Sequence, residues 1–325
     1  DAEVARRLRR LVGPFILRRE KRDPGILADL PEKIERTVVC PLTPEQAALY
    51  QAAVDRALGG REPGASHDAG LRAASAFERR GRILALLTGL KQICNHPAQY
   101  LHEQGPAPPG RGPAATPPSG LGRRSGKLAV ACEIVAEAVS GGAQLLCFTQ
   151  FVEMGRLLVA TLSADLGVDV PFLHGAVPAT QRDRIVAAFQ GEGEGLAKLG
   201  VELPPPVLVV SLRAGGTGLN LTAATHVVHY DRWWNPAVED QATDRAHRIG
   251  QSQVVEVHKL VTAGTVEERV AEMLERKRAL AQQVVGTGES WVTELSDAEL
   301  DELVALGSDA PVTDLEDELD WPEAN

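Results

Sequence analysis

Residues 207–220 read VLVVSLRAGGTGLN, an apolar run followed by a turn rich in glycine. The run Val207–Val210 is typical of a strand that is buried on both faces, and the glycines are typical of a tight turn into a helix. Ligands collect at the carboxyl ends of parallel strands, where exposed backbone amides suit phosphate oxygens. The segment therefore predicts an α/β fold with a ligand-binding edge, although a plain structural turn explains the glycines equally well.

The same pattern recurs from Ser125 onward, where short apolar runs alternate with stretches of helical periodicity. Continuous apolar strands, each followed by a helix, indicate a parallel sheet covered on both faces. Capping patterns at Thr180, Thr265 and Asn235 mark helix starts. The predicted strands are 144–148, 171–173, 207–210, 226–230 and 254–260. The predicted fold class is α/β, a doubly wound parallel sheet with a helical protrusion inserted before it.

The chain divides by composition into five parts. The first opens with a basic helix-like stretch and ends in a strand-like run, and the second begins with a capping box at Thr43. The third is rich in proline and glycine, which is typical of a linker or surface loop. The parts are 1–40, the helical protrusion 41–102, the loop 103–124, the sheet-bearing lobe 125–285, and the acidic tail 286–325.

Charge is distributed unevenly along the 325 residues, whose net charge is −10. The tail holds 13 acidic and no basic residues, which leaves 34 basic and 31 acidic residues, a net charge of +3, over 1–285. This distribution permits a local phosphate-binding surface. No apolar stretch is long enough to span a bilayer, and the start carries no signal-peptide pattern or methionine, so we expect a fragment of a longer protein. The four cysteines form no CxxC pair, so no zinc site, disulfide framework or other metal site is predicted.

Two arginines stand out in the segment QATDRAHRIGQ, residues 241–251. Arg245 and Arg248 are three residues apart and would share one face of a helix. Two guanidinium groups on one face suit a clamp on phosphates. A solvated helix with a surface ion pair is the plainer interpretation of the same charges.

Several longer blocks, taken together, resemble the Swi/Snf family of DNA-translocating ATPases in helicase superfamily two. QATDRAHRIGQ, AGGTGLNL and WWNPA carry the resemblance most strongly. Further blocks occur in the family's order: PFILRR at 14–19, LPEK at 30–33, LKQICNHP at 90–97, SGKL at 125–128, CFTQF at 147–151, and FLHG with QRDRIVAAF within 172–189. Two departures are the pair Arg232-Trp233, where an acidic residue is common, and a long insertion at 191–206.

The resemblance implies that 125–285 is the second of two RecA-like motor lobes, which bind ATP between them. It makes Arg245 and Arg248 the catalytic arginine fingers, and it places Gly218 and Gln251 near the nucleotide. It also implies contacts with the backbone of duplex DNA. The DNA-binding residues would be Thr149, Gln150, His174, Gly175, Arg213, Ala214, Gly215, Gly216, Thr217 and Trp234.

The phosphate-binding loop expected of such a motor is missing from the sequence. Residues 120–127 resemble one, but Leu121 stands where the first glycine is required and Leu128 follows Lys127 in place of Ser or Thr. The resemblance therefore implies that ATP and Mg²⁺ are bound mainly by a missing first lobe and that this fragment alone binds neither. The expected partners are that lobe, duplex DNA and an unidentified DNA-bound protein, in the cytoplasm of a bacterium, associated with its nucleoid.

Two other interpretations stay open: a stand-alone nucleic-acid-binding or regulatory module without an ATPase role, and a lobe of an RNA-directed helicase. In the tail, a capping box at Ser296 predicts a short brace helix over about 297–306 that docks on the lobe.

Overall fold

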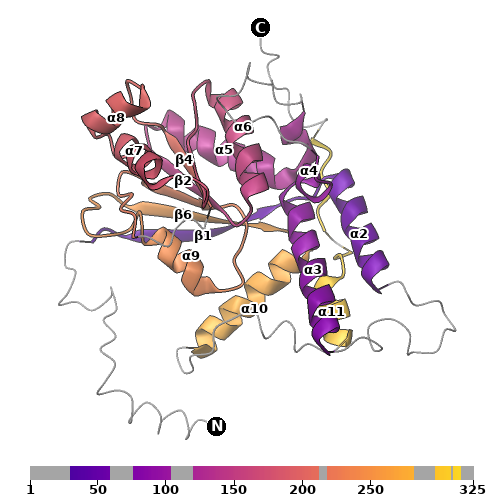
Figure 1. Ribbon diagram of the computed structural model, residues 1–325. Coiled ribbons are helices and arrows are strands. Elements are labelled where there is room, and N and C mark those ends of the chain that lie inside the picture. Colours follow the sequence, from indigo (N-terminus) through magenta and orange to yellow (C-terminus); the bar gives the residue numbers. More distant parts are fainter. Residues whose placement is uncertain are drawn as a thin grey trace, which may run out of the picture.

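The computed structural model describes residues 30–58, 76–103, 120–211, 218–281, 297–308 and 310–315. Its centre is a six-stranded sheet in the order β1-β6-β5-β2-β4-β3 (Figure 1). Every pairing between neighbouring strands is parallel. The strands are β1 (Lys33–Cys40), β2 (Leu145–Thr149), β3 (Phe172–Leu173), β4 (Val207–Ser211), β5 (His226–His229) and β6 (Val255–Thr262).

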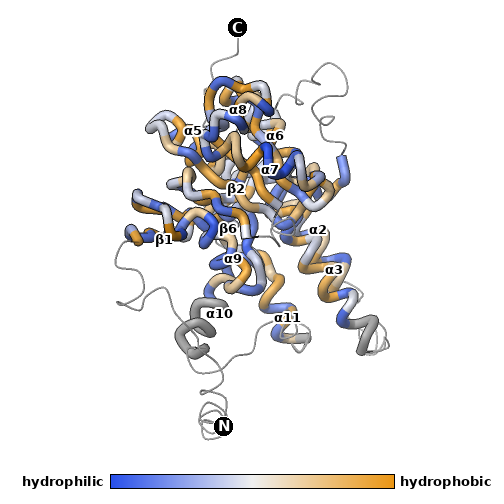
Figure 2. Tube along the Cα trace, turned by 60° about the vertical axis from the view of Figure 1, so that its left-hand side comes forward, coloured by the Kyte–Doolittle hydropathy of each residue, from blue (hydrophilic) through white to orange (hydrophobic). Residues whose placement is uncertain are grey.

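Helices cover both faces of this sheet, because successive side chains of each strand point to opposite faces. One face packs against α5 (Gly126–Ser140) and α6 (Val152–Leu166) through residues such as Cys147 and Val209. The other packs against α7 (Ala179–Phe189) and α9 (Pro236–Thr243) through residues such as Phe148 and Val210. Figure 2 shows the resulting apolar interior around β2. The predicted doubly wound parallel sheet is confirmed.

A second apolar cluster lies beside the sheet. It joins α2 (Pro44–Leu58) and α3 (Ala76–Asn95) to α10 (Val266–Ala281) and α11 (Asp297–Val304). Buried side chains from α11, Leu300, Leu303 and Val304, contribute to it. The short helix predicted in the tail is therefore present, and it packs on α10 and the predicted protrusion. We also expected Trp291 and Leu295 to support this helix, but both lie outside the described residues.

Most predicted helix starts agree with the structure. The Thr43 hydroxyl accepts a hydrogen bond from the Gln46 amide, and the Gln46 carboxamide accepts one from the Thr43 amide, which forms the predicted capping box. Asn235 caps α9 through the Ala237 amide. The helix predicted from Thr180 instead starts at Ala179, after Pro178, without a side-chain cap.

The edge strand β1 is where the structure adds most to the predicted organisation. Residues 33–40 pair in register with β6, so this strand completes the sheet of the lobe that was predicted to begin at 125. The other boundaries remain predictions. The proline- and glycine-rich insertion at 191–206 contains a short helix, α8 (Gly193–Leu199). The smaller remaining elements are α4 (Pro97–Tyr100) and the 3₁₀ helix η2 (Leu121–Arg124). Within the described residues, no helix is long and apolar enough to cross a membrane.

Candidate functional site

The residues that the resemblance assigns to DNA gather at one edge of the sheet. Thr149 ends β2 and is followed by Gln150, while His174 and Gly175 follow β3. Trp234 comes shortly after β5, which neighbours β2. Because all strands are parallel, their carboxyl ends share this edge, where ligands of such sheets bind. Residues 213–217, predicted to contact DNA after β4, lie outside the described residues.

Asp231 connects the end of β5 to the loop that follows β2. Its carboxylate accepts hydrogen bonds from the Thr149 hydroxyl at 2.5 Å and from the Gln150 amide at 2.9 Å. The Gln150 side chain donates in turn to the Arg232 carbonyl at 2.8 Å. Thr149 and Asp231 are fully buried. The Thr149 hydroxyl therefore fixes the loop after β2 from inside, and the surface of that loop is left to Gln150.

Burial raises the pKa of Asp231, although the hydrogen bond from Thr149 and the charge of Lys91 act in the opposite direction. Asp231 was not predicted from the sequence as a site residue. Its position directly after an apolar strand was the available signal, because such positions lie at the carboxyl edge.

Trp234 rests on the predicted protrusion. Its side chain is half-buried against the cluster formed by α2, α3, α10 and α11. The Lys91 ammonium lies 4.2 Å from the centre of a Trp234 ring, within the range of a cation–π contact. Lys91 is 3% exposed, its ammonium has no hydrogen-bond partner within the described residues, and burial lowers its pKa to about 8. A desolvated cation therefore packs against the face of the Trp234 indole.

A buried ion pair shapes the turn that presents this tryptophan. The Arg232 guanidinium donates to both carboxylate oxygens of Glu239, at 2.9 and 3.2 Å. Glu239 also accepts from the Trp233 amide at 2.8 Å. Burial alone would raise the pKa of Glu239, but the charge of Arg232 and the hydrogen bonds to the carboxylate lower it overall. The charge of Arg232, which stands where an acidic residue is common in the family, is thus balanced by Glu239 on α9.

His174 and Gly175 form the outer part of the edge. The His174 ring lies against Phe172, with ring centres 4.8 Å apart, and its Nδ1 accepts from the Ala176 amide. Gly175 is exposed, and a side chain there would meet nothing within 4 Å. Both residues are accessible to a large partner.

The two arginines do not share a helix face as predicted. Helix α9 ends at Thr243, and Arg245 and Arg248 lie in the turns that follow it. The turns are fixed by bonds from the Arg245 amide to the Ala242 carbonyl and from the Leu221 amide to the Arg245 carbonyl. Burial, and then the charge of Arg248, lowers the pKa of Arg245. The two guanidinium groups are therefore neighbours, with Arg245 buried and Arg248 exposed.

Gly218 and Gln251 occupy different positions around these arginines. A side chain at Gly218 would lie 3.7 Å from the Arg248 guanidinium, so this glycine leaves the arginine open. Gln251 is buried, and its amide group donates to the carbonyls of Thr222, Ala224 and Ala246. It ties the arginine turns to the segment before β5, and no part of its amide remains for a ligand.

Lys127, in the segment that resembles a phosphate-binding loop, is unavailable to phosphate. It is fully buried, and its ammonium donates to Glu267 at 2.5 and 2.7 Å and to the Asn95 side chain at 3.3 Å. The conclusion drawn from the spacing, that this is no phosphate-binding loop, agrees with this geometry.

Comparison with known proteins gives consistent matches. Residues 126–250 match the helicase conserved C-terminal domain, and residues 1–99 match the SNF2-related domain. The chain is 42% identical over 310 residues to the putative ATP-dependent helicase/translocase YwqA of Bacillus subtilis, which covers 95% of this chain and 30% of that protein.

Solved structures give the same result. The SWI2/SNF2 ATPase core of Sulfolobus solfataricus in complex with dsDNA is 38% identical with a TM-score of 0.67, over 93% of this chain and 56% of that one. The C-terminal domain of the Sulfolobus SWI2/SNF2 ATPase is 36% identical with a TM-score of 0.64, over 85% of this chain and 100% of that one. The chain thus spans less than a third of the curated relative and all of this solved domain. It belongs to the SNF2 family of helicase-like ATPases and forms the C-terminal part of the ATPase, the helicase C-terminal lobe with the end of the SNF2-related domain.

Proposed function

We propose that this chain is the C-terminal motor lobe of an ATP-dependent translocase that moves on duplex DNA and displaces or remodels DNA-bound proteins. The observation that carries the proposal is the shared edge, where Asp231 joins the loop after β2 to the turn that presents Trp234. The same hydrogen-bonded unit thus carries Gln150 and Trp234, two of the residues assigned to DNA. The relative solved with dsDNA supports duplex DNA as the ligand.

On the DNA side, we propose that Gln150, His174, Gly175 and Trp234 contact the backbone, and that residues 213–217 do so from the neighbouring loop. Thr149 is buried, so its part is to position Gln150. Contacts of this kind read no sequence. They predict weak binding with a log–log salt slope of about −0.9 for each phosphate contacted.

On the nucleotide side, we propose that Arg245 and Arg248 are the arginine fingers. An exposed guanidinium beside a glycine fits a γ-phosphate, and its charge would stabilise the transition state. Gln251 acts by holding the arginine turns. The residues present fit one side of an ATP site; a first lobe would supply the phosphate-binding loop and the groups that hold Mg²⁺, which polarises the phosphates when bound.

A turnover assay tests the division of labour. The 325-residue chain with ATP, Mg²⁺ and duplex DNA should hydrolyse no more ATP than its Arg245→Ala/Arg248→Ala variant, because neither has a phosphate-binding loop. DNA-stimulated turnover above that variant would refute the proposal that a first lobe is required.

Two other functions remain as competing outcomes. A stand-alone binding module would bind DNA, and adding a first lobe in trans would restore no turnover. An RNA-directed lobe would bind duplex RNA more tightly than duplex DNA at the same salt concentration. The buried Lys91–Trp234 contact, which joins the protrusion to the DNA edge, favours the motor.

A further inference from the structure

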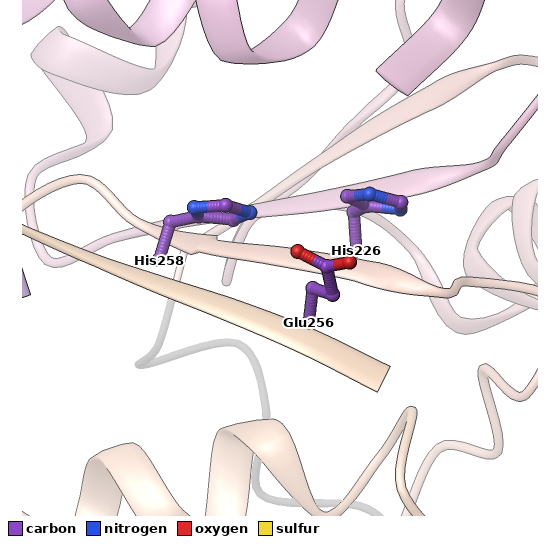
Figure 3. A group of neighbouring side chains, drawn as sticks. All are labelled: His226, Glu256 and His258. Atoms are coloured by element: carbon purple, nitrogen blue, oxygen red, sulfur yellow. The ribbon is translucent and has the colours of Figure 1, made fainter. Parts of the chain in front are cut away.

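Three potential metal ligands lie together on the neighbouring strands β5 and β6. His226 opens β5 and is the register partner of Glu256, and His258 follows two residues later on β6. Each offers one ligand atom, and these atoms lie within 4.8 Å of one another. Figure 3 shows both rings on one side of the strands with the Glu256 carboxylate between them.

This cluster is separate from the site described above. Residues alternate along a strand, so the three side chains share the face of Val228, which packs under α5 and α6. The arginine turns belong to the opposite face, where Ala246 is buried. His226 begins β5, whereas Asp231 follows the end of that strand.

The histidines have nitrogen atoms left for a ligand. The His258 Nε2 is buried and has no hydrogen-bond partner within the described residues. The His226 Nδ1 lies 3.1 Å from the Thr225 hydroxyl. A metal-bound histidine characteristically uses its second nitrogen in this way, so His226 has the outer contact of a ligand already in place. The rings are nearly parallel, 7° apart, with centres 6.1 Å apart.

Charges of both signs surround the cluster. The Arg36 guanidinium lies 4.0 Å from the Glu256 carboxylate, but its side chain is 62% exposed, so this ion pair is weak. Glu137, on α5, lies near His258 and adds negative charge. A bound cation would pair Glu256 and would occupy the unsatisfied His258 nitrogen.

We propose that His226, Glu256 and His258 form a site for a divalent transition metal of the Zn²⁺ class, which pins β5 to β6 at the amino-terminal end of both strands. Two imidazoles and one carboxylate are a common ligand set for Zn²⁺, with water in the fourth position. The site was not predicted from the sequence, because His226 lies thirty positions before Glu256 and no CxxC pair marks it. Register between strands brings them together.

Competition from cysteine is weak in this chain. Cys40, Cys94, Cys132 and Cys147 are all buried. Burial raises the pKa of each thiol, to about 12 for Cys40 and Cys94. The thiolate that binds zinc is therefore disfavoured at neutral pH in the folded chain.

Isothermal titration of the full 325-residue chain with ZnCl₂, repeated with Co²⁺ and read by its visible absorption, tests the proposal. We expect one equivalent bound, and a melting temperature that rises with added Zn²⁺. His258→Ala and Glu256→Gln should weaken binding by more than the roughly 10–100-fold typical of outer contacts, and Thr225→Val by about tenfold. The matched control is His102→Ala, because His102 is an exposed histidine 3.7 Å from one carboxylate, Glu153.

A variant of opposite sign keeps the test decisive if His258→Ala does not fold. Arg36→Gln removes a positive charge beside Glu256 and should tighten Zn²⁺ binding roughly threefold. Far-UV circular dichroism verifies the fold of each variant. Equal Zn²⁺ affinity in the parent and Glu256→Gln, weaker binding in Arg36→Gln, or a loss in His102→Ala as large as in Glu256→Gln would each overturn the proposal.

Discussion

Lys127→Met tests how strongly the buried ion pair with Glu267 stabilises the junction where α5, α10 and the end of α3 meet. Both side chains are 0% exposed, and Lys127 also reaches the Asn95 side chain at the end of α3. Methionine keeps the length and apolar packing of the stem but leaves the Glu267 carboxylate with only the Thr262 amide as a described partner. Removing one partner of a buried pair typically costs 3–5 kcal/mol. Because the Thr262 hydrogen bond remains, we expect a loss of about 3 kcal/mol.

Urea unfolding followed by far-UV circular dichroism measures this loss. The double variant Lys127→Met/Glu267→Leu should recover part of it, because it leaves no unpaired buried charge. Lys198→Met breaks the exposed pair with Glu194 and should leave the free energy of unfolding close to that of the parent. A loss below about 1 kcal/mol in Lys127→Met, or a double variant less stable than the single one, would refute the reasoning.

Three further changes have defined outcomes. His229 is buried, and burial lowers its pKa from 6.5 to about 4. The unfolded chain therefore takes up a proton first, and stability should be lost as pH falls from 6.5 towards 4. The difference in the free energy of unfolding between pH 7 and pH 5, measured by melts, should be smaller in His229→Gln than in the parent, by up to about 2 kcal/mol. In an ATPase reconstituted with a first lobe, Arg248→Ala should lower turnover roughly 10³-fold or more. Its DNA affinity, measured by fluorescence anisotropy, should stay within about twofold of the parent value. A large affinity loss with intact turnover would place Arg248 on the DNA side. In the same ATPase, Lys91→Met should reduce DNA stimulation of turnover more than basal turnover, as should Trp234→Ala, and an unchanged stimulation ratio would show that the Lys91 contact does not position the indole.

Elements with a local signal were predictable from the sequence. Buried strands such as Val207–Ser211 have continuous apolar runs, and capped helices such as the one after Asn235 begin with residues that satisfy their own first amides. Contacts between distant segments were not predictable. The pairing of β1 with β6 joins residues more than two hundred positions apart, and its alternating pattern does not say which sheet it completes.

The site shows the same division. Arg245 and Arg248 were found by a motif, but their spacing suggested a helix that the structure ends at Thr243. Asp231 and Lys91 were missed because a buried charge shows no periodicity, and its partner is distant in the chain. Gln251 belongs to the motif, yet its side chain is used entirely within the fold. A motif thus marks a region under functional demand without separating the residues that touch a ligand from those that hold them.

Two buried cations reach the same junction from different elements, and this arrangement couples the edge proposed to contact DNA to the rest of the chain. Lys91, on α3, lies under Trp234, and Lys127, at the start of α5, pairs with Glu267 at the start of α10. Asn95 connects Lys127 to Asp231, because its side chain contacts both. The charge of Lys91 acts on the same Asp231 carboxylate. Asp231 in turn holds the loop after β2. A shift of the protrusion by part of an ångström would therefore strain charged contacts in a desolvated interior, where electrostatic interactions are strongest. Such contacts favour discrete arrangements over gradual ones, which is the property that the proposed translocase needs if it is to grip DNA in one state and release it in another.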